Sequence, residues 1–131
     1  MSGRFPDAER VMIALASPFG HACQTLPLGP DGKFDRSKMP VIWVARTGGA
    51  RDDITDRPLL QVGVLAESRA DATRIGEDLR DVVLASGGTR ADGVLIDTAR
   101  EVTGVQELRD IDPLNRLVQA AYQLSFRRQS H

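Results

Sequence analysis

The sequence predicts an α+β protein, a two-layer sandwich in which two helices pack on one face of a mainly antiparallel sheet. Two segments have the apolar period of an amphipathic helix, and the segments around them are rich in β-branched and aromatic residues. The segment from Val118 to Phe126 alternates between apolar and mostly polar side chains, which is typical of a strand with one face on a core and one in solvent. The expected order is helix, three strands, helix, two strands.

The first helix is expected from about Pro6 to Ala16. Pro6 suits the first helical position, and Asp7 and Glu9 add negative charge where the helix dipole favours it. Pro18 and Gly20 should end the helix. Its apolar stripe consists of Ala8, Val11, Met12 and Leu15.

The second helix opens at Ser68, where Ser68-Arg69-Ala70-Asp71 resembles a capping box with Asp in place of Glu or Gln. Arg74 and Asp78 have the spacing of an ion pair on the helix surface. Gly87-Gly88 should end the helix as a C-cap. The apolar stripe consists of Ala72, Ile75, Leu79, Val82 and Val83.

The strand signals are separated by segments rich in glycine, proline and charge. Thr47-Gly48-Gly49-Ala50 is expected to break the second strand, and residues 51–58 should form a protruding charged loop, since they are too many for a two-residue hairpin turn. Residues 27–40 lack apolar periodicity and are expected to form an exposed loop or arm. Besides the final strand, strands are expected at Ala22–Leu26, Val41–Arg46, Leu59–Ala66 and, long or bent, Gly93–Val105.

The bulk composition indicates one soluble domain over residues 1–131. Seventeen basic against eighteen acidic residues give a net charge of −1, which argues against a dedicated nucleic-acid binder. Cys23 is the only cysteine, so no intrachain disulfide is expected and a reducing compartment is inferred. The first residues lack the pattern of a signal peptide, and no apolar run approaches the roughly 18 residues of a membrane span.

No motif points to a resident metal or cofactor. His21 and Cys23 would lie on the same side of a strand, but a zinc site needs further ligands, and only His131 remains as another histidine or cysteine. A buried cysteine beside a surface histidine is the alternative interpretation. A serine nucleophile would need a histidine base, and neither histidine has a recognisable context. We therefore expect no catalytic residues, no cofactor and no metal.

The carboxylates Asp52, Asp53 and Asp56 form a local acidic cluster. Such a cluster can hold Mg²⁺, but no lysine is near and Arg51 and Arg57 flank it as charge partners. A solvated, salt-bridged loop is the simplest interpretation, and an intersubunit contact comes before a metal.

Two further features each have two interpretations. Thr47-Gly48-Gly49 follows a strand, as phosphate-binding glycines often do, but lacks the spacing and the following helix of a phosphate-binding loop, so a turn is expected. Trp43 lies in the middle of a strand and fits either core packing or an interface anchor.

Four segments together resemble the tail terminator proteins of long-tailed bacteriophages of the actinobacterial type. They are Phe5-Pro-Asp-Ala-Glu-Arg-Val, Pro40-Val-Ile-Trp-Val-Ala-Arg-Thr-Gly-Gly, Arg51-Asp-Asp-Ile-Thr-Asp-Arg-Pro-Leu and Tyr122-Gln-Leu-Ser-Phe-Arg. The resemblance spans nearly the whole chain and depends on the order and spacing of these segments. It departs from the family at residues 27–39, which are longer and more charged.

The resemblance implies a structural virion protein, not an enzyme, located at the head-proximal end of the tail and assembled in the host cytoplasm. It implies a ring of about six copies, whose heterologous contacts close without free edges. The ring would sit on the tail tube protein, stop tube polymerisation and join the head-completion or stopper protein, while DNA passes the lumen without specific binding. No membrane is involved. The loops expected to reach a neighbour contribute Lys33, Phe34, Lys38, Arg51, Asp52, Asp53, Asp56 and Arg57, with the aspartates pairing with arginines across the subunit boundary.

Two other functions fit the same sequence features. A head-completion or head–tail adaptor subunit has a similar size and ring habit, and the ring on which it stacks would distinguish it. A small non-viral α+β binding domain would instead be a monomer or dimer.

Overall fold

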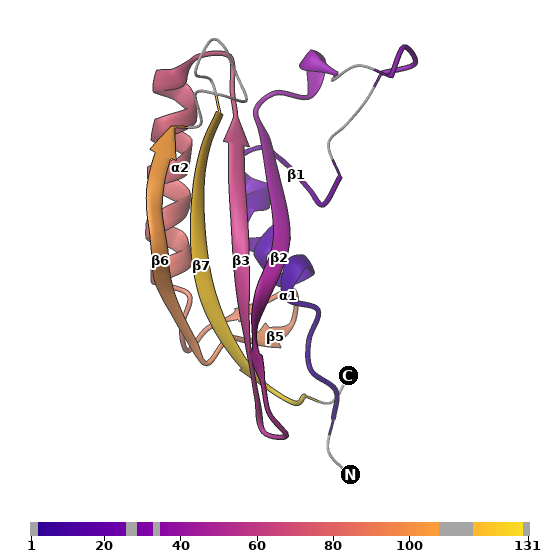
Figure 1. Ribbon diagram of the computed structural model, residues 1–131, viewed down its shortest axis with the longest axis vertical. Coiled ribbons are helices and arrows are strands. Elements are labelled where there is room, and N and C mark those ends of the chain that lie inside the picture. Colours follow the sequence, from indigo (N-terminus) through magenta and orange to yellow (C-terminus); the bar gives the residue numbers. More distant parts are fainter. Residues whose placement is uncertain (1–2, 26–28, 33–34, 108–116, 130–131) are drawn as a thin grey trace.

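The computed structural model describes residues 3–25, 29–32, 35–107 and 117–129, and these form two layers (Figure 1). One layer is a five-stranded sheet in the order β1-β2-β3-β7-β6, and the two helices cover one of its faces. This confirms the expected α+β sandwich. The sheet strands are β1 (His21–Cys23), β2 (Val41–Arg51), β3 (Thr55–Leu65), β6 (Thr98–Glu107) and β7 (Leu117–Arg127), and the helices are α1 (Ala8–Ala16) and α2 (Arg69–Leu84).

The sheet is antiparallel except at one edge, where β1 runs parallel to β2. Shorter elements complete the described chain. They are the 3-10 turns η1 (Ser17–Phe19) and η2 (Arg36–Lys38) and the small hairpin of β4 (Arg90–Ala91) and β5 (Val94–Leu95). The structure describes no helix long and apolar enough to cross a membrane.

Side-chain caps set where both helices begin. Asp7 accepts hydrogen bonds from the backbone of Glu9 and Arg10, so α1 begins at Ala8 and Pro6 lies outside the helix instead of at its first position. Ser68 caps α2 by accepting from the Asp71 backbone at 3.1 Å, as the sequence predicts. The expected Arg74–Asp78 pair is not formed; Arg74 contacts Asp71 at 3.2 Å instead. Asp71 lies in the first turn of α2, at the positive end of the helix dipole, where a carboxylate is favoured.

The core lies between the sheet and the helices, and β7 crosses its middle. The alternation predicted for this strand is confirmed, since each of its expected inward residues is buried. Ala72, Leu79 and Val83 of α2 are also buried, so α2 covers the part of this face formed by β3, β7 and β6, and α1 covers the part formed by β2. The buried residues of β7 are Val118, Ala120, Tyr122, Leu124 and Phe126.

The chain from residue 41 to residue 65 is one long hairpin, which corrects the expected break and protruding loop. β2 continues to Arg51 and β3 begins at Thr55, so only residues 52–54 form the turn. The glycines mark a bulge between Arg46 and Gly48, not a break. Gly49 has φ +102°, and a Cβ atom there would lie 2.1 Å from the carbonyl oxygen of Arg57. Only glycine allows the two strands to approach so closely.

Two other boundaries differ from the expectation. The long strand expected at residues 93–105 is divided, because Asp92 and Gly93 take left-handed conformations and fold Val94–Leu95 back onto β4. The strand expected at residues 22–26 is His21–Cys23. Within the expected arm at residues 27–40, the described part contains η2, which Asp35 caps. Residues 110–115, where Pro113 predicts a turn, lie outside the described residues.

Candidate assembly interface

Asp56 lies at the centre of the far end of the β2–β3 hairpin, where its side chain is completely buried. Arg46 from the opposite strand donates to both carboxylate oxygens, at 2.8 and 2.9 Å. Arg51 adds a third hydrogen bond at 2.9 Å. A planar guanidinium suits this two-point contact, and the pairing compensates for burying the charge. The three side chains lock the hairpin strands together near their turn.

The pKa of Asp56 reflects this balance. Burial by itself raises the pKa, because it disfavours the charged carboxylate, but hydrogen bonds and charge from Arg46 and Arg51 outweigh burial and lower it to about 2. Asp56 is therefore ionised at any physiological pH, and the network is formed by charged partners.

A pH dependence of stability follows. The pKa of Asp56 falls from its ordinary value of 3.8 to about 2 in the fold, so the carboxylate stabilises the fold above that ordinary value and loses this effect as pH falls toward 2. We expect the wild type to lose about 2 kcal/mol more than Asp56→Asn between pH 7 and pH 2. Urea denaturation across this range measures the difference. Parallel curves for the two proteins would contradict it, and the comparison cancels Asp35 and Asp52, whose pKa values hydrogen bonds lower in both proteins.

Both ends of the described chain fasten the same hairpin end. The guanidinium groups of Arg51 and Arg128 lie 4.7 and 4.4 Å from the ring centre of Phe5, within cation–π range. Arg128 also donates to the backbone carbonyl of Asp53 at 3.1 Å. Arg4 and Gln129 exchange two backbone hydrogen bonds. The hairpin end is thus held by segments from three parts of the sequence.

The turn itself presents two side chains outward. Asp52 is used internally: one oxygen accepts from the backbone of Ile54 and Thr55 at 2.8 and 2.7 Å, and the other lies 3.3 Å from Arg57. Asp53 is exposed, and its carboxylate makes no hydrogen bond or ion pair with any described residue. Ile54 is 69% exposed, unusual for a large apolar side chain. The turn is therefore a rigid tip with an unpaired charge beside an apolar group.

The residues expected at an interface do not form one cluster. Arg51, Asp52, Asp53, Asp56 and Arg57 meet at the hairpin end, whereas exposed Lys38 belongs to η2 at the opposite end of the sheet (Figure 1). Lys33 and Phe34 lie outside the described residues. The pairing expected for the aspartates also differs for two of them: Asp56 pairs with arginines of its own chain, and Asp52 pairs with Arg57.

Sequence analysis missed Arg46, Phe5 and Arg128 as partners at this end. Arg46 closes the predicted strand; in the hairpin register it lies opposite Leu60, and its side chain reaches Asp56, whose cross-strand partner is Arg51. The sequence features that could have indicated these partners are the aromatic Phe5 near one terminus and the pair Arg127 and Arg128 near the other. Nothing in the sequence shows that these termini meet.

The sheet face opposite the helices is uncovered and hollowed at the hairpin end. A shallow depression of about 570 Å³ spans β3, β6 and β7. Arg57, Arg100 and Arg127 line it, with Asp97 as its one carboxylate. Arg57 pairs with Asp52 and Arg127 with Asp97, each at 3.3 Å. Arg100 bonds to the neutral Gln123 at 2.7 Å and has no carboxylate partner among the described residues, so the depression carries the charge of one uncompensated arginine. Its other lining residues are Thr55, Thr98, Gln123 and Ser125.

Trp43 also lies on this uncovered face, because its neighbours Ile42 and Val44 point into the core. The indole is half-buried over Gly63, and its Nε1 donates to the carbonyl of Gln24 at 3.2 Å. The prediction that Trp43 packs in the helix-covered core is therefore wrong. Its interpretation as an interface anchor stays a prediction.

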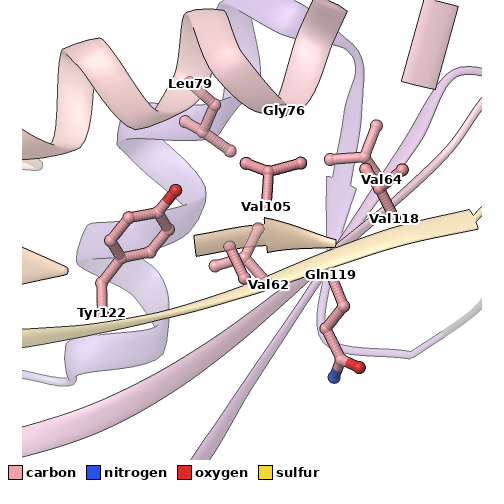
Figure 2. Close-up of a pocket in the computed structure, with 9 residues that line it drawn as sticks. Val62, Val64, Gly76, Leu79, Val105, Val118, Gln119 and Tyr122 are labelled. Atoms are coloured by element: carbon pink, nitrogen blue, oxygen red, sulfur yellow. The ribbon is translucent and has the colours of Figure 1, made fainter. Parts of the chain in front are cut away.

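A small space between α2 and the sheet, about 10 Å³ in volume, is too small and too apolar for a ligand. Figure 2 shows Leu79, Val105 and Val118 around it and Gly76 above. A void of this size accepts at most one water, and it offers that water almost no polar partner. Across the described ranges, no three His, Cys, Asp or Glu side chains are grouped so that they could hold a metal ion. Burial raises the pKa of the Cys23 thiol, which leaves it protonated.

The fold and this surface describe a small α+β protein. Its charged side chains form ion pairs within the chain, and its hairpin tip and one sheet face are exposed to partners. The family model described as phage tail termination protein matches residues 4–131, and the chain belongs to that family. It is a structural component of a phage tail. No curated protein matches the chain.

Proposed function

We propose that this chain forms a ring of about six copies on the last ring of the tail tube, ends tube polymerisation and joins the tail to the head-completion protein. The family supports the tail role, and the rigid hairpin tip is the observation that carries the contact. Exposed Asp53 and Ile54 project from a framework that Asp56 and its arginines hold fixed. A preorganised tip binds without an ordering cost.

The ring has two functional surfaces in this proposal. The hairpin tip contacts a neighbouring subunit or the tail tube, through Ile54 packing and through Asp53 pairing with an arginine of the other chain. Carboxylates face the lumen, where they repel phosphates and let DNA pass without binding. The balanced net charge of −1 supports this. Binding of a DNA duplex at moderate salt would contradict the lumen assignment.

Light scattering of the purified chain over a range of concentrations, with and without tail tube protein, tests the proposal. We expect a mass of about six subunits, either alone or once tail tube protein is added. A dimer that is independent of concentration, or a monomer indifferent to tail tube protein, would contradict it and favour the binding-domain alternative.

Substitutions at the hairpin tip test whether the tip contributes to assembly. Asp53→Ala combined with Ile54→Ala should leave the fold intact, because both side chains are exposed, and should weaken assembly by on the order of tenfold in concentration. Asp52→Ala with Asp53→Ala is a less specific test of assembly, because Asp52 also stabilises the turn by accepting hydrogen bonds from the backbone of Ile54 and Thr55. The matched control is Val102→Ala, which truncates a similarly exposed apolar side chain away from the hairpin. Equal assembly of the tip variant and the control would remove the tip from the interface.

A further inference from the structure

Among the described residues, the sheet face opposite the helices is open to a partner, whereas the β6 edge is poorly suited to one. β6 is the outer strand on one side, and its pairing with β7 shifts register at two places. Such irregularities twist an edge away from strand addition. A neighbour that approaches this side of the sheet therefore contacts its face, where the depression lies, and not its edge.

The depression fits a convex, acidic partner. Arg100 and Arg127 are exposed there, and Arg57 is half-exposed; Asp97 pairs with Arg127 and Asp52 with Arg57, which leaves Arg100 without a carboxylate partner among the described residues. The hollow is formed by three adjacent strands, a shape that accepts the side chains of a helix. Three arginines are few for a duplex binder, and the chain has no basic excess.

An acidic helical surface of this kind occurs on the same chain. The second half of α2 exposes Glu77, Asp78 and Asp81 on its outer side, with the 37%-exposed Val82 beside them. Within the described residues, Glu77 and Asp78 make no hydrogen bond or ion pair, whereas Asp81 lies 3.7 Å from the guanidinium of Arg80, which is also bonded to Glu101 of β6.

This acidic surface conflicts with the preferences of an isolated helix. Glu77 and Asp81 are like charges one turn apart, and Asp81 lies in the last turn, where the helix dipole disfavours negative charge and where no basic residue is present. Arg80 offsets part of the charge of Asp81, but Glu77 and Asp78 have no ion-pair partner among the described residues, so these two carboxylates are available to another chain. α2 lies on one face of the sheet (Figure 1), and the lining residues of the depression lie on the other face, so one copy cannot pair the two charged surfaces with each other.

We infer that the acidic outer face of α2 in one copy docks in the arginine-lined depression of the sheet in the next copy. This contact is heterologous, since each copy uses two different surfaces, and such contacts build rings. The inference rests on the proposed ring and names the surfaces that close it. Electrostatic complementarity then sets which copies pair and in which orientation.

Charge exchange tests the contact. Arg100→Glu with Arg127→Glu reverses the depression, and Glu77→Lys with Asp78→Lys reverses the helix face. Each pair should raise the concentration needed for ring formation by on the order of tenfold or more, because like charges then face each other. The chain with all four substitutions should recover assembly close to that of the unchanged protein. Light scattering with tail tube protein present is the measurement.

Controls keep this result separate from folding and from the ring itself. Arg36→Glu with Arg90→Glu reverses two exposed arginines outside the depression and should leave assembly unchanged. Thermal unfolding should place the melting temperature of every variant within a few degrees of that of the unchanged chain, and Arg100→Gln with Arg127→Gln replaces the reversed pair if that pair does not fold.

A ring that is insensitive to both sheet-face variants, or no recovery with four substitutions, overturns the inference alone. Absence of any ring from the unchanged chain overturns the proposed function as well. Duplex DNA binding that the sheet-face reversal abolishes would assign the depression to phosphate and overturn the inference.

Discussion

Asp56→Ala is expected to lower the free energy of unfolding by about 3 kcal/mol, because it leaves two arginines without the carboxylate around which they pack. Arg46 loses both of its bonds to Asp56, and Arg51 loses one. Both guanidinium groups are partly exposed and regain some hydration, so we place the effect at the lower end of the range for a broken buried pair. Urea denaturation at neutral pH measures it.

The matched control for Asp56 is Asp53→Ala in the same hairpin. Asp53 is exposed and its carboxylate makes no contact with the described residues, so its removal should change stability by less than about 0.5 kcal/mol. A loss from Asp56→Ala no larger than that of the control would show that the buried network contributes little. The difference between the two variants also bears on assembly, because a loosened hairpin end would no longer hold its tip fixed.

Leu79→Ala is expected to cost about 4 kcal/mol, the largest effect of a single substitution considered for this chain. Leu79 is 1% exposed and lies against the void of about 10 Å³ under α2 (Figure 2). Truncation removes buried methyl groups and enlarges an existing hole. Rigid strands line the other side of that hole, so little collapse is available to reduce the cost.

Val82→Ala provides the comparison on the same helix. Val82 belongs to the predicted apolar stripe, yet it is 37% exposed, so its truncation should cost less than about 1 kcal/mol. Thermal or urea unfolding of the two variants in parallel measures the contrast. Similar losses at positions 79 and 82 would mean that both side chains pack inward, contrary to the exposure that the structure gives Val82.

The elements were predicted well wherever one strong local pattern acts. The alternation in β7 identified each buried residue of that strand, and the spacing around Ser68 located the start of α2 within one residue. Predictions failed where a local signal had two meanings. Gly48 and Gly49 mark a bulge as readily as a strand end, and only the pairing of β2 with β3 shows which one occurs.

The candidate site was predicted less completely than the fold. The cluster at residues 51–57 was found from its density of charge, but the partners of each carboxylate were not. Asp56 pairs with Arg46 and Arg51 from the facing strand, and Phe5 lies against both Arg51 and Arg128, so residues from distant parts of the sequence meet here. The arginine-lined depression has the same origin, since its three arginines come from β3, β6 and β7.

The sequence by itself determined the class of fold, the faces of the main elements and the resemblance to tail termination proteins, because each depends on patterns within a few residues or on the order of segments. Tertiary structure decided which charges are paired internally and which remain for a partner. That division depends on strand register and on burial, which place distant residues within bonding distance and exclude water from Asp56 while leaving Asp53 exposed.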